Sequence, residues 1–321
     1  MPTPPSEHVV RVAAVDCGTN SVRLLVADLH PGTGEQRDVD RQLRIIRLGE
    51  GVDAAGRLAP EAVDRLLAAC GDYAAVMSRC GVTRARACAT SAARDVADVD
   101  GRGWRDAVRS RLGVAVEVIG GPAEARLTAA GAFRGVRGMD LPEPLLVVDV
   151  GGGSTELATS DGHLASMQVG AVRLTERLMP GERSQPYQVH AAEAEVDRAL
   201  RGVWAAGVPE GAVARSLVAV GGTAVTVAGY VLGIGREELE RVHRAQLPLD
   251  DVVAACRELA STPVTERAAL ACMHPGRADV IGAGAVVLER VVAAVRPVLQ
   301  SDTLVISTHD ILDGIAWSVV S

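Results

Sequence analysis

Short apolar runs alternate along the chain with longer stretches in which apolar residues recur at helical spacing. The runs predict strands at 9–15, 22–29, 42–48, 85–89, 114–119, 145–148 and 303–306. The longer stretches predict helices at 60–78, 191–206, 249–260, 277–296 and 311–319. Such alternation over the whole chain predicts an α/β architecture.

One predicted strand, 145–148, runs into an unusual turn, Asp149-Val150-Gly151-Gly152-Gly153-Ser154-Thr155-Glu156. Consecutive glycines let the backbone approach a ligand closely, and the successive N–H groups of such a turn can bind an anion. Asp149 and Glu156 flank the turn and would repel a phosphate unless a cation such as Mg²⁺ lay between them. A tight hairpin with two solvated carboxylates is the simpler alternative.

The same pattern occurs near the N-terminus. Residues 12–24 align with residues 145–157, and Asp, Gly, Ser and Leu recur in register. A further strand, 217–220, leads into Gly221-Gly222-Thr223. Because repeated strand–turn units indicate repeated substructures, the sequence predicts two similar domains that face each other across a cleft, each offering its loop to one phosphate chain.

Composition narrows the classes of function. The formal net charge is −7, which disfavours binding to nucleic acid through a basic surface. The sequence contains no lysine, so arginine, backbone N–H groups and metal must meet any phosphate. The six cysteines lack Cys-x-x-Cys spacing, which is typical of reduced thiols in the cytoplasm. We expect no signal peptide and no membrane span.

Together the two glycine motifs resemble those of the exopolyphosphatase/guanosine pentaphosphate phosphohydrolase (Ppx/GppA) family, within the actin/sugar kinase/Hsp70 superfamily. The resemblance covers nearly the whole chain, in a short two-domain form. It implies two actin-like (ribonuclease H-like) domains, which we place at 1–128 and 129–321. A final helix near 308–321 could pack back on the first domain.

The resemblance also implies a catalytic base. The family segment Gly-x-x-Glu-Ala-Arg-Leu reads Gly121-Pro122-Ala123-Glu124-Ala125-Arg126-Leu127 here, which makes Glu124 the candidate that activates water. Many relatives carry a second glutamate where Ala123 stands. A glutamate that only favours the helix N-terminus is the alternative.

Further residues are candidates for binding the phosphate or the metal. The family segment that ends in Arg94 implies a phosphate contact, whereas Arg23 is a weaker candidate that could face solvent. The remaining phosphate-binding candidates are loop residues, namely Gly18, Thr19, Asn20, Ser21, Gly151, Gly152, Gly153, Ser154, Gly222 and Thr223. The metal candidates are Asp149, Glu156 and Asp16.

Three segments either differ from the family sequence or have a role that the sequence does not decide. His243 is followed by Arg244 where relatives have glycine, so we assign it no role. Arg277 and Asp279 match a family segment that could form a salt bridge or contact ligand. The segment at Leu312 lacks the family arginine, which puts a phosphate contact there in doubt.

The resemblance implies a Mg²⁺-dependent exopolyphosphatase that removes terminal phosphate from inorganic polyphosphate. Guanosine pentaphosphate is the alternative substrate. A kinase or ATPase of the same superfamily and a non-catalytic binder of polyphosphate or alarmone are the rival classes. We expect a cytoplasmic homodimer that binds neither nucleic acid nor membrane.

Overall fold

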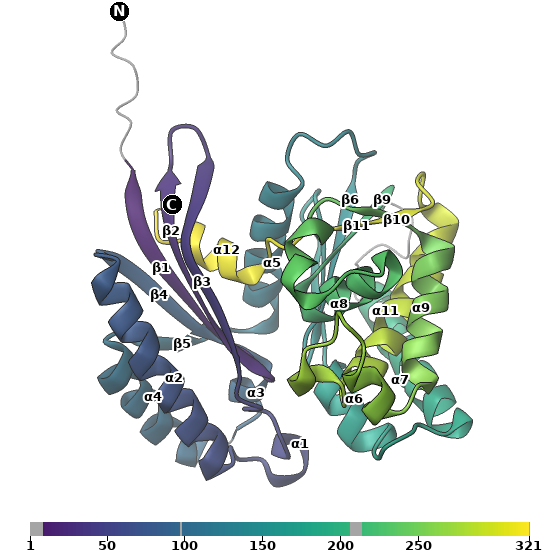
Figure 1. Cartoon of the computed structure of the whole chain (residues 1–321), viewed down its shortest axis with the longest axis horizontal. Helices are drawn as coiled ribbons and strands as arrows, with labels where there is room; N and C mark the ends of the chain where they lie inside the picture. Colours follow the sequence, from purple (N-terminus) through teal and green to yellow (C-terminus); the bar gives the residue numbers. More distant parts are fainter. Residues whose placement is uncertain (1–8, 97, 206–213, 321) are drawn as a thin grey trace, which may run out of the picture. The chain divides into compact units, whose positions relative to one another are not determined.

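The computed structural model of the chain describes residues 9–96, 98–205 and 214–320. It divides into two compact units (Figure 1), unit 1 comprising Met1–Gly120 with Ile311–Ser321 and unit 2 comprising Gly121–Asp310. Each unit is an α/β structure built on its own sheet, as the sequence predicts. No helix within the described ranges is long and apolar enough to cross a membrane.

Unit 1 is a five-stranded sheet in the order β3-β2-β1-β4-β5, with β1, β4 and β5 parallel and β2 and β3 antiparallel. Its strands are β1 (Val10–Cys17), β2 (Ser21–His30), β3 (Glu35–Ile45), β4 (Arg84–Ala89) and β5 (Val116–Val118). Its helices are α1 (Val52–Ala55), α2 (Pro60–Arg79), α3 (Ser91–Arg94), α4 (Asp98–Leu112) and α12 (Ile311–Trp317).

Unit 2 repeats this arrangement, with the order β10-β11-β9-β6-β7-β8. Its strands are β6 (Leu145–Val150), β7 (Thr155–Thr159), β8 (Leu164–Met167), β9 (Ser216–Val220), β10 (Gln246–Pro248) and β11 (Thr303–Ile306). Its α-helices are α5 (Gly121–Gly135), α6 (Ala171–Leu178), α7 (Pro186–Ala205), α8 (Gly221–Leu232), α9 (Leu249–Ser261), α10 (Val264–Ala268) and α11 (Ile281–Val295). Short 3₁₀ turns are η1 (Arg236–Val242), η2 (Pro275–Arg277) and η3 (Arg296–Val298).

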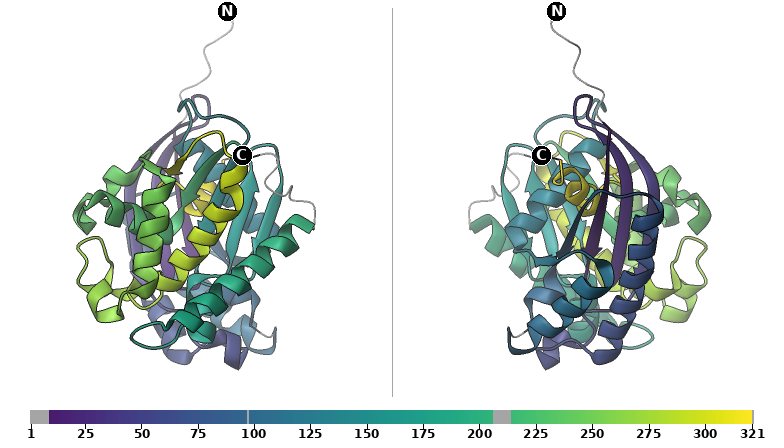
Figure 2. Two further views of the ribbon diagram at one scale, coloured as in Figure 1. Left: turned by 90° about the vertical axis from the view of Figure 1, so that its right-hand side faces the viewer. Right: turned by 90° about the vertical axis from the view of Figure 1, so that its left-hand side faces the viewer.

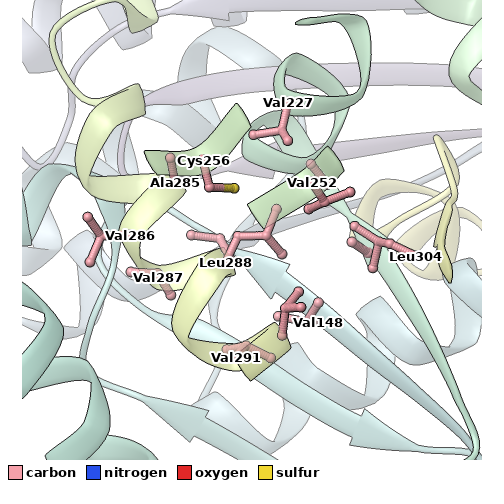
Figure 3. Close-up of a cluster of buried hydrophobic side chains, with 14 of the residues drawn as sticks. Val148, Val227, Val252, Cys256, Ala285, Val286, Val287, Leu288, Val291 and Leu304 are labelled. Atoms are coloured by element: carbon pink, nitrogen blue, oxygen red, sulfur yellow. The ribbon is translucent and has the colours of Figure 1, made fainter. Parts of the chain in front are cut away.

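The core of unit 2 lies between its sheet and helices α8, α9 and α11. Side chains from alternate positions of the parallel strands, such as Val148 and Leu304, pack against Leu288 and Val291 of α11 (Figure 3). Helix α5 covers the opposite face through Ala132, which packs with residues of the same strands that point the other way. The strands are therefore buried on both sides, which explains their continuous apolar runs.

The division between the units differs from the expected boundary at residue 128. Helix α5 packs against β7 and β8, and Gly121 at its start lies against the side chain of Ser166. A methyl group at Gly121 would lie 2.6 Å from Cβ of Ser166, so glycine is needed for this approach. All of α5, including Glu124, consequently belongs to unit 2.

The C-terminal helix α12 belongs to unit 1, where it packs on β1, β2 and β4 (Figure 2 shows it in yellow). Its Asp313 is fully buried and accepts hydrogen bonds from Arg41 Nη2 and Gln36 Nε2, each at 2.6 Å. Trp317 Nε1 donates to Gln36 Oε1 at 2.9 Å. An arginine from β3 thus neutralises the carboxylate in the segment that lacks the family arginine.

The sequence mislocated one strand. The third strand was expected at 42–48 but spans 35–45, because it pairs with the whole of β2 from Ser21 to His30. Most of its residues up to position 41 are polar and exposed or half-buried, since β3 is an edge strand with a solvated face. Helix α6 and strand β8 were not predicted at all.

Candidate active site

The glycine loop of unit 2 joins β6 to β7. The N–H of Gly151 donates to the carbonyl of Ser154 at 3.0 Å, which closes the turn. Within the described residues, the N–H groups of Gly152 and Gly153 have no hydrogen-bond acceptor. Two adjacent backbone donors are therefore left for an anion, as the sequence predicts for a phosphate loop.

Three carboxylates lie beside this loop in unit 2. Asp149 and Glu156 are directly opposite each other on β6 and β7, and Glu124 lies in the first turn of α5. Their exposed fractions are only 9% for Asp149, 2% for Glu156 and 8% for Glu124. The simpler alternative of a solvated Asp and Glu is thus wrong. The structure brings together the predicted base and two of the predicted metal ligands.

Within this group, the surroundings of Glu156 disfavour its negative charge. Burial raises the pKa of the Glu156 carboxyl well above its ordinary value, and the negative charges of Glu124 and Asp149 raise it further. Hydrogen bonds from Ser166 and Ser154 act in the opposite direction. Ser166 Oγ donates to Glu156 Oε1 at 2.8 Å.

Asp149 and Glu156 fit a magnesium ion that takes only a few of its ligands from the protein. Among the described residues, no group of three or more His, Cys, Asp and Glu side chains is arranged as a closed metal site. Mg²⁺ needs no such cage, because it is commonly held by one or two carboxylates, waters and phosphate oxygens. The cross-strand pair Asp149 and Glu156 would supply those carboxylates.

The third glycine segment lies close to this group. Gly221 has a positive φ of 79°. The Asp149 carboxylate fills the space beside it where the Cβ of any other residue would lie. Gly222 makes room in the same way for the Arg277 guanidinium. Thr223 Oγ1 donates to the carbonyl of Val150 at 3.3 Å, so the predicted phosphate ligand Thr223 ties α8 to the end of β6.

The loop of unit 1 has the same backbone geometry. The N–H of Gly18 donates to the carbonyl of Ser21 at 2.9 Å, as Gly151 does to Ser154. Residues 46–49 brace this loop, since the carbonyl of Asn20 accepts from Ile46 and Arg47, and the N–H of Gly49 donates to Thr19. The repeat seen in the sequence is therefore a repeat of structure.

The charges of the two loops differ. Asp16 is 4% exposed, and Arg23, opposite it on β2, donates to its Oδ2 from Nη2 at 2.7 Å and from Nε at 3.1 Å. Arg23 accordingly faces the loop rather than solvent. Arg94 donates to the carbonyl of Ile119 at 3.1 Å, also within unit 1. A metal role for Asp16 and a phosphate contact for Arg94 stay predictions.

Sequence reasoning missed two side chains that support the unit 2 loop. Ser166 lies on the short strand β8, which carries no clear alternation. Arg173 lies in α6, and its Nε donates to the carbonyl of Gly153 at 2.9 Å. Helix α6 starts after Gly170, without a side-chain cap, so the usual signal for a helix start is absent.

Comparisons with known proteins extend over both units. The sequence profile of the Ppx/GppA phosphatase family matches residues 25–318. Exopolyphosphatase 2 of Mycobacterium tuberculosis is 42% identical over 321 aligned residues, which cover 97% of this chain and 99% of that protein. The crystal structure of an exopolyphosphatase-like protein is 35% identical with a TM-score of 0.89, covering 97% of both chains. An Aquifex aeolicus Ppx/GppA structure is 25% identical with a TM-score of 0.79, covering 98% of both.

Proposed function

The chain belongs to the Ppx/GppA phosphatase family, and on that premise we propose that it is an exopolyphosphatase that hydrolyses the terminal phosphate of inorganic polyphosphate. The observation that carries the proposal is the buried group of Glu124, Asp149 and Glu156 beside a glycine loop with open N–H groups. A cation site alone would suit a binding protein as well, whereas a further buried carboxylate, Glu124, beside the anion site is what a hydrolase needs as a base.

In this mechanism the N–H groups of Gly152 and Gly153 bind phosphate oxygens and hold the chain in place. Glu124 accepts a proton from a water molecule and directs the water oxygen at the terminal phosphorus. The bond from that phosphorus to the bridging oxygen breaks, so that phosphate is released and the shortened polyphosphate is the leaving group. Burial keeps bulk water from competing for that carboxylate. Asp149 and Glu156 would hold Mg²⁺, which supplies charge neutralisation for the phosphate oxygens.

Guanosine pentaphosphate is the second candidate substrate, since the family includes both kinds of hydrolase. The test is a phosphate-release assay in which the purified protein is incubated separately with polyphosphate, guanosine pentaphosphate and ATP, each at the same concentration of terminal phosphate. We expect Mg²⁺-dependent release from polyphosphate to be fastest. Faster release from guanosine pentaphosphate would reassign the substrate, and turnover of ATP alone would favour the kinase or ATPase alternative.

A homodimer and a cytoplasmic location are part of the same proposal. Sedimentation of the purified protein tests the first, since a monomer at micromolar concentration would contradict it. Cell fractionation tests the second.

A further inference from the structure

The segment from the end of β8 into α6 binds the glycine loop along its whole length. Five hydrogen bonds join them: Thr155 Oγ1 to the carbonyl of Val169, Ala171 N to that of Gly151, Val172 N and Arg173 N to that of Gly152, and Arg173 Nε to that of Gly153. Four of these bonds end on the three glycine carbonyls.

The direction of these carbonyls fixes the direction of the loop N–H groups. In a planar trans peptide the C=O and the following N–H point to opposite sides. Because the carbonyls of Gly151, Gly152 and Gly153 face α6, the next N–H in each peptide points away from α6. The anion-binding face of the loop is thus set by what the carbonyls bind on the other side.

Gly170 permits the close approach that these bonds require. A methyl group on Gly170 would lie 2.6 Å from both the carbonyl carbon and the carbonyl oxygen of Gly152. Those atoms are backbone, so they cannot move without displacing the loop. A side chain at position 170, outside the loop, would therefore disturb the loop.

We propose that Arg173 is a positioning residue for phosphate binding: it holds the Gly153 carbonyl towards α6 and thereby fixes the Gly153–Ser154 peptide, which keeps the open N–H groups of the loop in their anion-binding orientation. Among the described residues, backbone N–H groups of α6 hold the other carbonyls, whereas the Arg173 side chain holds that of Gly153. The planar guanidinium fixes the direction of its Nε–H, which a lysine ammonium cannot reproduce. The inference rests on the proposed function and adds to it a residue outside the loop.

The test compares Arg173→Lys with Arg177→Lys on the same helix. Arg177 lies one turn further along α6, where it forms an ion pair with Glu195 at 3.7 Å. Both variants keep their charge, so a difference reports geometry rather than electrostatics. We expect Arg173→Lys to weaken tripolyphosphate binding, measured by calorimetry with Mg²⁺, by roughly tenfold, as for the loss of one charge-assisted hydrogen bond. We expect KM for polyphosphate to rise with it and Arg177→Lys to match the wild type.

Two glycine variants test the same proposal independently. Gly170→Ala should weaken tripolyphosphate binding at least as much as Arg173→Lys, whereas Gly202→Ala should not, because nothing lies within 4 Å of the added methyl group on α7. Wild-type affinity in both Arg173→Lys and Gly170→Ala would overturn the proposal.

A structural readout separates this inference from the proposed function. In a crystal structure of ligand-free Arg173→Lys, we expect the Gly153 carbonyl to turn away from α6 or to adopt more than one conformer. An unchanged peptide would overturn the positioning role, whatever the substrate. If the wild type binds tripolyphosphate but releases no phosphate from polyphosphate, the proposed function fails and the positioning role is still decided by the two measurements.

Discussion

Asp149 and Glu156 face each other across β6 and β7, at the positions that Asp16 and Arg23 occupy across β1 and β2. The two hairpins share a fold and a turn hydrogen bond, yet one contains a carboxylate pair and the other an ion pair. In unit 1 the protein itself supplies the positive charge. In unit 2, burial and the negative charges of Glu124 and Asp149 disfavour the ionised form of Glu156, and a bound cation would relieve that repulsion.

This difference predicts an unusual response to removing a buried charge. Glu156→Gln keeps an acceptor for Ser166 but removes the repulsion from Glu124 and Asp149. In chelator we expect its melting temperature to equal or exceed that of the wild type. Mg²⁺ should raise the melting temperature of the wild type only, because a ligand that binds the folded state stabilises it.

Glu289→Gln is the matched control. Glu289 is also buried, at 4% exposed, but Arg257 contacts it at 2.8 Å and Arg290 at 3.7 Å. Its replacement should destabilise the fold by about 1–3 kcal/mol, with or without Mg²⁺. If both variants lost stability alike in chelator, the carboxylate group of unit 2 would not be repulsive and the argument for a cation would fail.

We expect Ser166 to affect the Mg²⁺ concentration that the enzyme needs for activity. Its hydroxyl orients Glu156 from β8, so Ser166→Ala leaves the carboxylate in place but less constrained. We expect the Mg²⁺ concentration for half-maximal phosphate release to rise by about tenfold, in the range found when groups that orient a metal ligand are removed. The exposed Ser261→Ala is the control, and an identical Mg²⁺ titration for both variants would contradict this role.

Arg244 should stabilise α5, the helix that carries Glu124. Its Nε donates to the carbonyl of Gly135 at 2.8 Å and its Nη2 to that of Arg137 at 2.9 Å, which satisfies the helix C-terminus. It does so from a left-handed conformation, φ 63°, that suits the glycine of relatives.

Two substitutions separate the hydrogen bonds from the strain. Arg244→Ala loses both bonds and keeps the strain, so urea unfolding should show a loss of about 2 kcal/mol. Arg244→Gly also loses the bonds but relieves the strain, so its loss should be smaller by about 1 kcal/mol. Equal losses would mean that the backbone conformation at this position costs nothing.

The repeated fold and the loop geometry could be predicted from the sequence, because an Asp-x-Gly turn after an apolar run is a local signal for a hairpin. That signal occurs in both halves of the chain. Asp149 and Glu156 became neighbours for the same reason. The supports Ser166 and Arg173 could not be found that way, since they reach the loop through tertiary packing of a short strand and an uncapped helix. The boundary at Gly120 depended on the approach of Gly121 to Ser166, which no local pattern shows.

Phosphate release from polyphosphate by Glu124→Gln tests the central claim most directly. The substitution preserves size and removes the base, so turnover should fall by about 10²–10⁴-fold while tripolyphosphate binding survives. Glu61→Gln is the matched control, because Glu61 also lies in the first turn of a helix, α2, but is exposed. The account predicts near-wild-type turnover for Glu61→Gln and almost none for Glu124→Gln. If Glu124→Gln kept most of its turnover, Glu124 would be only a residue that favours the start of its helix.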